Sequence, residues 1–313
     1  MNSEVMINQD VNTERNGGVA LNMDALFEAV RNKGPVCVGL DTAPDYLPPV
    51  YGPDGRRGRD RNPAAAILDY NKALVDATFD LCACYKVQIA YYESLGIDGL
   101  AAYRDTLRYI KEHGGLCIAD IKRGDIADTA AQYAKAHFSG DFEADFVTLS
   151  PYMGMDTLDP WLAHASNTGK GAFVLLRTSN PGARDFQWAP LKNGEPLYTA
   201  IADKLVTLAE QTAGKHGYGA FGAVVGCTDP TEAAAIREHC HNLFLLIPGY
   251  GAQGGGAKDA ARLLQNNNGG IVNASRSILC AWKTHPGCGE SLQAAAAARD
   301  ATAAMRDALT GNS

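Results

Sequence analysis

Short apolar segments recur along this chain, and each is followed by a stretch with helical spacing of apolar residues. Runs such as VCVG at 36–39 and LFLLI at 243–247 are almost continuously hydrophobic, as in the strands of a parallel sheet buried on both faces. We expect strands at residues 35–41, 83–89, 116–122, 145–150, 172–179, 220–226, 243–248 and 270–276. Helices are expected at residues 62–80, 97–113, 127–138, 155–167, 197–216, 230–240, 256–266 and 289–309.

Eight strand–helix units in 313 residues predict an α/β fold, a (β/α)8 TIM barrel. A doubly wound open sheet is the alternative, but no GxGxxG turn follows the first strand. No break in composition divides the chain into two parts. We therefore expect a flexible N-terminal extension over residues 1–20 and a single barrel domain over residues 21–313, with an N-terminal helix.

Charge and composition narrow the classes of partner. A net charge of −7 gives no support for nucleic-acid binding, which needs a basic face. No run approaches the roughly 18 consecutive apolar residues of a membrane span, and the polar N-terminus lacks the apolar core of a secretory signal. The eight cysteines are scattered and form no CxxC pair. We expect a cytoplasmic protein with free thiols and with neither nucleic-acid nor membrane partners.

One expected strand ends in an unusual group of charges, LCIADIKRGDI at 116–126. Because alternate residues of a strand share a face, Asp120 and Lys122 should project together into the barrel mouth. Asp125 follows after one turn, close enough to join them or to reach a neighbouring subunit. Carboxylates on either side hold a buried lysine in its charged form. The pattern predicts a fixed ammonium between two anions, suited to stabilising or protonating a developing negative charge.

The two preceding strands add to this group. Lys86 and Gln88 repeat the alternate spacing on the second strand, and Asp41 ends the first. We expect Asp41, Lys86, Asp120 and Lys122 to be neighbours at the C-terminal ends of the strands, where barrel enzymes carry their active sites. A purely structural layer of salt bridges is the alternative. Buried ion pairs stabilise proteins weakly, so a dense set of them favours chemistry.

A phosphate site is predicted where barrels often have one, after the seventh and eighth strands. The seventh is followed by PGYGAQGGG, which contains Pro248, Gln253 and Gly255, and then by a helix. Closely spaced glycines let backbone N–H groups approach an anion at a helix N-terminus. Ser275 and Arg276 end the eighth strand and bring a guanidinium to the same place.

The fifth strand ends in RTSNPG, which contains Thr178 and Ser179. Hydroxyl and amide groups there could hydrogen-bond a planar polar ligand, although Asn-Pro-Gly is also an ordinary turn sequence. We expect the residues from this motif to Pro196 to form a long loop, a common form of lid in barrels.

Taken together, these motifs resemble the orotidine 5′-phosphate decarboxylase family, in its longer form (the type 2 subfamily). The DIKRGDI motif at 120–126 carries the resemblance, joined in order by GLD, YKVQIAYYE, RTSNPGA, PGYGAQGG and the Ser-Arg pair at 275–276. The similarity covers nearly the whole chain from about residue 20.

The resemblance implies a lyase of the carboxy-lyase class that uses no cofactor or metal. Such an enzyme converts orotidine 5′-monophosphate to UMP, the last step of de novo pyrimidine biosynthesis. Lys122 would protonate C6 as carbon dioxide leaves. In the homodimer that the resemblance implies, Asp125 and Thr129 would reach across from the partner subunit. The implied catalytic residues are Lys122, Asp120, Asp125 and Lys86. The implied substrate-binding residues are Asp41, Gln88, Ile126, Thr129, Thr178, Ser179, Pro248, Gln253, Gly255, Ser275 and Arg276.

Three other interpretations stay open at this point. A metal-dependent sugar-phosphate decarboxylase or aldolase would need an acidic metal ligand on the second strand, where this chain has Lys86 and Gln88. A non-catalytic barrel would bind a phosphate ligand without turning it over. The chain could also be one part of a longer bifunctional pyrimidine enzyme.

Overall fold

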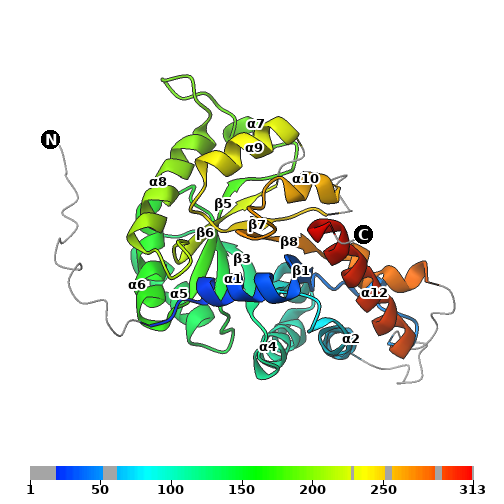
Figure 1. Ribbon diagram of the computed structural model, residues 1–313. Coiled ribbons are helices and arrows are strands. Elements are labelled where there is room, and N and C mark those ends of the chain that lie inside the picture. The colour runs from blue at the N-terminus through cyan, green and yellow to red at the C-terminus, as the bar shows by residue number, and fades with distance from the viewer. Residues whose placement is uncertain (1–18, 52–61, 227–228, 251–255, 286–290, 312–313) are drawn as a thin grey trace.

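Eight parallel strands close into a barrel in which each strand pairs with the next along the chain and β8 pairs with β1 (Figure 1). The computed structural model describes residues 19–51, 62–226, 229–250, 256–285 and 291–311. The strands are β1 Val36–Gly39, β2 Cys84–Gln88, β3 Cys117–Arg123, β4 Phe146–Leu149, β5 Gly171–Arg177, β6 Phe221–Val225, β7 Leu245–Ile247 and β8 Gly270–Ala274. All eight expected strands and the barrel are confirmed, and the open sheet is excluded.

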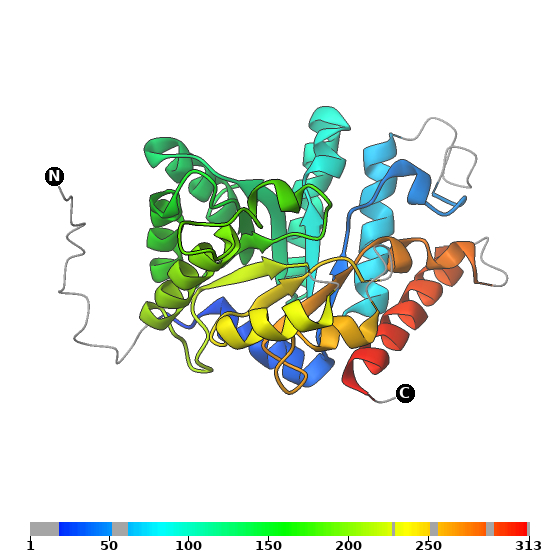
Figure 2. The same ribbon diagram turned by 90° about the horizontal axis from the view of Figure 1, so that it is seen from above.

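Helices surround the barrel (Figure 2) and bury the outward-facing apolar residues of the strands. They are α1 Asn22–Lys33, α2 Pro63–Thr78, α3 Ala90–Glu93, α4 Gly96–Glu112, α5 Ala127–Phe138, α6 Asp159–Thr168, α7 Ala183–Phe186, α8 Leu197–Gln211, α9 Pro230–His239, α10 Ala257–Ala261, α11 Arg276–Leu279 and α12 Ser291–Thr310, with the 3-10 turns η2 Pro44–Tyr46, η3 Met155–Leu158 and η4 Ala281–Lys283.

Three expected helices differ from the structure. The helix expected over 197–216 ends at Gln211. The segment expected as one helix over 155–167 is divided into η3 and α6, and Pro160 lies in the first turn of α6, where its missing N–H costs nothing. The helix expected over 256–266 ends at Ala261, and its last expected residue, Asn266, has the left-handed φ of 52°. A left-handed residue cannot continue a right-handed helix.

The N-terminal end of the barrel is closed by α1, which lies across the strands in Figure 1. Its residues Met23, Leu26 and Val30 are buried against the side chains that fill the barrel interior. Those interior side chains include Cys37, Cys84, Ile118, Phe146, Phe173, Phe244, Leu246 and Ile271. The expected N-terminal helix is therefore confirmed, whereas residues 1–18 of the expected extension lie outside the described residues.

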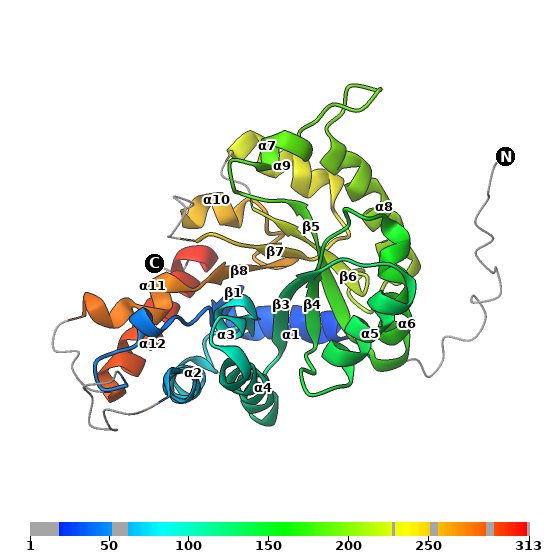
Figure 3. The ribbon, with the colours of Figure 1, turned by 180° about the vertical axis from the view of Figure 1, so that it is seen from behind.

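The opposite end of the barrel carries the short helices α3, α7 and α11, which follow β2, β5 and β8 (Figure 3). None of them was predicted, because a four-residue helix holds little more than one turn of apolar periodicity. This end presents the C-terminal ends of the strands, where the polar strand ends gather.

Candidate active site

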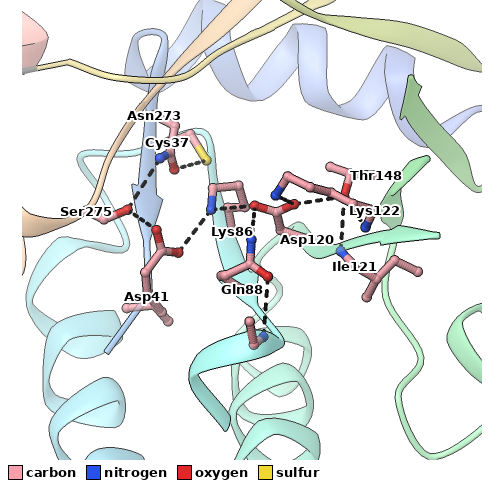
Figure 4. A network of polar contacts seen from close by, with 12 residues as sticks. Cys37, Asp41, Lys86, Gln88, Asp120, Ile121, Lys122, Thr148, Asn273 and Ser275 are labelled. Atoms are coloured by element: carbon pink, nitrogen blue, oxygen red, sulfur yellow. Dashed lines mark hydrogen bonds and ion pairs between the residues drawn. The ribbon is translucent and has the colours of Figure 1, made fainter. Parts of the chain in front are cut away.

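A row of alternating charges crosses the C-terminal ends of β1, β2 and β3 (Figure 4). Lys86 Nζ lies 3.0 Å from Asp41 Oδ1 and 3.0 Å from Asp120 Oδ2. Lys122 Nζ lies 2.5 Å from the other oxygen of Asp120. The structure thus brings together the four residues that the sequence predicts to be neighbours, in the order Asp41, Lys86, Asp120 and Lys122.

In this row, burial and the attraction between opposite charges shift the pKa values in opposite directions. Burial alone lowers the pKa of Lys86, but the charges of Asp41 and Asp120 outweigh it and hold the pKa above its ordinary value. Burial likewise raises the pKa of Asp120, but the charges of Lys86 and Lys122 outweigh it and lower the pKa to about 2. Both central groups are therefore ionised at neutral pH.

Among the described residues, the ammonium that lies between two carboxylates is that of Lys86. The sequence pattern predicts such a position for Lys122, with Asp125 coming from this chain or from a neighbouring subunit. Within the described part of the chain, the Asp125 carboxylate accepts a hydrogen bond from the Ile126 N–H at 2.8 Å, and Lys122 pairs with Asp120. The second anion expected beside Lys122 would have to come from a partner subunit, which stays a prediction.

Strand β3 does not deliver Lys122 by regular alternation. The pairing of β3 with β4 shifts register between Ala119 and Arg123, and Lys122 has a φ of 46°. Such a bulge redirects a side chain and is common beside active sites. The backbone N–H of Lys122 donates to Thr148 Oγ1 at 3.0 Å, so β4 holds the irregular backbone in place.

Asp120 is held by hydrogen bonds as well as by ion pairs. Gln88 Nε2 donates to one carboxylate oxygen and Thr148 Oγ1 to the other, each at 2.8 Å. Thr148 is buried on β4 and was missed from the sequence. The available signal was a hydroxyl residue inside the apolar run FVTL at 146–149.

A cavity of about 520 Å³ opens over the charged row. Its lining residues are Asp41, Tyr46, Lys86, Gln88, Tyr91, Asp120, Lys122, Pro248, Gly249, Tyr250, Asn273, Ser275 and Arg276. Eight of the predicted site residues thus share one cavity, five from the ends of β1, β2 and β3 and three from the ends of β7 and β8. The other lining residues, Tyr46, Tyr91, Gly249, Tyr250 and Asn273, were not among the expected site residues. Tyr46 and Tyr91 lie in η2 and α3, which carry no periodic signal.

Other predicted residues lie elsewhere. Gln253 and Gly255 lie outside the described residues. Ile126 and Thr129 are exposed at the start of α5 and do not line the cavity as described for one chain. Thr178 and Ser179 follow β5, and Thr178 is hydrogen-bonded through both its N–H and its Oγ1 to the Gln187 side chain, each at 2.8 Å.

No group of three or more His, Cys, Asp or Glu side chains with a metal-binding arrangement occurs among the residues that the structure describes. Within that same part of the chain, no helix is both long and apolar enough to cross a membrane. The described cysteines 37, 82, 84, 117, 240 and 280 are free thiols.

Fold and site together define a (β/α)8-barrel enzyme built around a lysine–aspartate row at the barrel mouth. Residues 34–284 match the model of the orotidine 5′-phosphate decarboxylase / HUMPS family. The chain belongs to this family, as the sequence motifs predicted.

Individual relatives agree with this assignment. An orotidine 5′-phosphate decarboxylase of Clostridium perfringens is 51% identical over 286 residues, which cover 91% of this chain and 97% of the relative. One from Clostridium kluyveri is 52% identical over 261 residues, covering 83% of this chain and 88% of the relative.

Solved structures show the same fold. The OMP decarboxylase of Leishmania donovani superposes with a TM-score of 0.68 at 31% identity, covering 91% of this chain and 98% of that one. The UMP synthase of the same organism gives a TM-score of 0.72 at 31% identity, and the match covers 92% of this chain but only 56% of the synthase.

Proposed function

We propose that this protein is a carboxy-lyase that converts orotidine 5′-monophosphate to UMP, the last step of de novo pyrimidine biosynthesis. The observation that carries the proposal is the Asp41–Lys86–Asp120–Lys122 row under an open cavity, in a chain whose relatives of 51% identity are named for this reaction.

The reaction requires stabilisation of one charge and delivery of one proton. When the bond between C6 and the carboxylate breaks, its electron pair stays on C6 and carbon dioxide leaves. The ring offers no adjacent conjugated group to delocalise that pair. A preorganised ammonium beside C6 stabilises the carbanion and then transfers a proton to it.

Lys122 is the proton donor in this proposal. Its side chain is 46% exposed and lines the cavity, so a substrate carbon could approach Nζ and the spent amine could regain a proton from water. Lys86 is 6% exposed at its side chain and bonded on both sides. It would hold Asp41 and Asp120 in place and, with Asp41, bind the ribose hydroxyls.

The remaining roles follow the position of each residue. Arg276, at the start of α11, would bind the phosphate end together with Pro248, Gln253 and Gly255. Thr178 and Ser179 would contact the pyrimidine once the β5 loop closes over it. Binding energy from the phosphate would serve to close the loops over the reacting ring.

The catalytic unit would be a homodimer of single barrel domains spanning residues 21–313. Asp125, Ile126 and Thr129 follow β3; Asp125 is half-buried, Thr129 is exposed and Ile126 is 52% exposed. Tyr152 and Met153, after β4, add further exposed apolar area. A second subunit covering this surface would bury it and bring its Asp125 and Thr129 to the cavity. Free thiols suit a reducing, cytoplasmic location.

The deciding experiment follows the fall in ultraviolet absorbance of orotidine 5′-monophosphate with the unmutated protein, with Lys122→Ala, and with EDTA added. We expect turnover that EDTA does not affect, and a loss of at least about 1,000-fold in kcat for Lys122→Ala, since proton transfer and charge stabilisation are lost together. Lys135→Ala, on α5, is the control for removing a lysine. Loss of turnover in EDTA would favour a metal-dependent enzyme, and binding of UMP without turnover would favour a binding protein.

A further inference from the structure

The Asp41 carboxylate is held on both of its oxygens by different strands. Lys86 on β2 binds Oδ1 at 3.0 Å, and the Ser275 hydroxyl, which follows β8, donates to Oδ2 at 2.8 Å. We propose that Ser275 is a positioning residue that orients Asp41 and, through it, Lys86, and that it does not act on the substrate directly. This inference rests on the proposed function and assigns Ser275 a role different from the phosphate contact considered above.

The Ser275 hydroxyl is itself oriented by Asn273, which Cys37 contacts in turn; Figure 4 draws both residues above Ser275. The Asn273 side-chain amide donates from Nδ2 to Ser275 Oγ at 3.4 Å, and its Oδ1 accepts from Cys37 Sγ at 3.5 Å. A serine hydroxyl has one proton to donate. Because Ser275 Oγ accepts a hydrogen bond from Asn273, its own proton is directed to Asp41. The hydrogen bonds thus run in one direction, from Cys37 to Asn273, from Asn273 to Ser275 and from Ser275 to the Asp41 carboxylate.

A glycine on β1 leaves room for this arrangement. Gly39 lies between Cys37 and Asp41 on the face of β1 that looks into the barrel. A Cβ atom at Gly39 would lie 2.0 Å from Ser275 Oγ and 2.9 Å from Asn273 Oδ1. Any other residue at this position would displace the serine hydroxyl, so the position of the Ser275 hydroxyl depends on the glycine at 39.

The contact matters because the charged row is continuous. A carboxylate held by Lys86 alone could turn about its Cβ–Cγ bond, whereas a donor on each oxygen fixes its plane. Asp41 shares Lys86 with Asp120, and Asp120 binds Lys122. A displaced Asp41 would therefore shift Lys86 and weaken the placement of the proton donor two ion pairs away.

A double-mutant cycle between Ser275→Ala and Asp41→Ala, with kcat and KM measured for orotidine 5′-monophosphate, tests the proposal. A hydrogen bond to a charged group corresponds to a loss of about 10- to 100-fold in kcat/KM for Ser275→Ala alone. In the Asp41→Ala background we expect less than about twofold further loss, since the residue then has nothing to position. Ser277→Ala, an exposed serine on α11, is the matched control and should stay near the unmutated value.

Gly39→Ala gives a second route that keeps the serine. We expect it to lower kcat/KM as Ser275→Ala does, because the new methyl group occupies the place of the hydroxyl. Thermal unfolding identifies variants that have folded. Losses that multiply in the double mutant, or full activity of Ser275→Ala, would overturn the proposal. Absence of turnover by the unmutated protein would contradict the proposed function instead, so the two failures are distinguishable.

Discussion

Lys86 and Lys122 carry the same charge and share Asp120, yet they lie in different surroundings. Lys86 is enclosed between two carboxylates, and their charges hold its pKa above the ordinary value despite burial. Lys122 is half-exposed at the cavity wall and has one carboxylate partner among the described residues. A group that must give up a proton needs access to the substrate and to water, which favours Lys122 as donor and Lys86 as a fixed charge.

Asp120 makes the site sensitive to acid. Its pKa in the folded protein is about 2, against 3.8 for an unperturbed aspartate, so the folded state binds its proton less readily than the unfolded chain. The resulting stability is fully present above about pH 4 and is lost as the pH falls toward 2. The shift corresponds to about 2 kcal/mol.

We therefore expect the difference in free energy of unfolding between the unmutated protein and Asp120→Asn to shrink by about 2 kcal/mol between about pH 5 and pH 2. Urea unfolding at a series of pH values, within the range where both proteins fold, measures this difference. Asp128→Asn, on the exposed start of α5, controls for the loss of a carboxylate. A difference that stays constant with pH would show that Asp120 does not carry the effect.

At the scale of elements, a buried polar cluster fixes the end of β1 beside Asp41. Asn71 on α2 accepts from Thr42 Oγ1 at 2.7 Å and donates to Tyr92 OH at 2.7 Å and Thr106 Oγ1 at 3.2 Å. The Tyr92 hydroxyl in turn donates to the Leu40 carbonyl at 3.0 Å. Three helices are thus tied to the residues on either side of Asp41.

Asn71→Leu keeps the branched shape of the side chain but leaves buried hydroxyls without their partner. We expect a loss of about 1–3 kcal/mol in the free energy of unfolding and a lower kcat, because Thr42 follows Asp41 directly. Asn167→Leu, an exposed position on α6, should change stability by less than about 0.5 kcal/mol. Denaturant unfolding and steady-state kinetics of both variants would decide, and equal stabilities would contradict the assigned role of the cluster.

Elements were predictable from the sequence where the physical signal repeats. Each strand is an apolar run buried on both faces, and Asp120 and Lys122 were recognisable as charges placed where an unpaired charge is costly. The bulge that redirects Lys122 was not predictable, because it depends on Thr148 of the next strand. The hydrogen bond from Ser275 to Asp41 joins residues 234 positions apart and has no local signal.

At the scale of the whole molecule, the two ends of the barrel differ in kind. The N-terminal end is filled by apolar side chains and closed by α1, whereas the opposite end holds the charges and the cavity. The site as described for one chain lacks the second anion expected beside Lys122. Asp125 is half-buried next to the exposed Ile126, and a second copy of the chain that covers this surface could receive it.

Mixing two inactive variants tests whether subunits complete each other's sites. Lys122→Ala and Asp125→Ala should each be inactive alone. If each site takes Lys122 from one subunit and Asp125 from the other, a mixed dimer contains one site with both residues intact and one site with neither. Random re-association of equal amounts makes half of the dimers mixed, so we expect recovery of about a quarter of the unmutated activity. Mixing Lys122→Ala with Asp120→Ala is the control and should recover no activity, because both residues belong to the row of the same chain. If the mixture of Lys122→Ala and Asp125→Ala also recovers no activity, each chain's site is complete by itself.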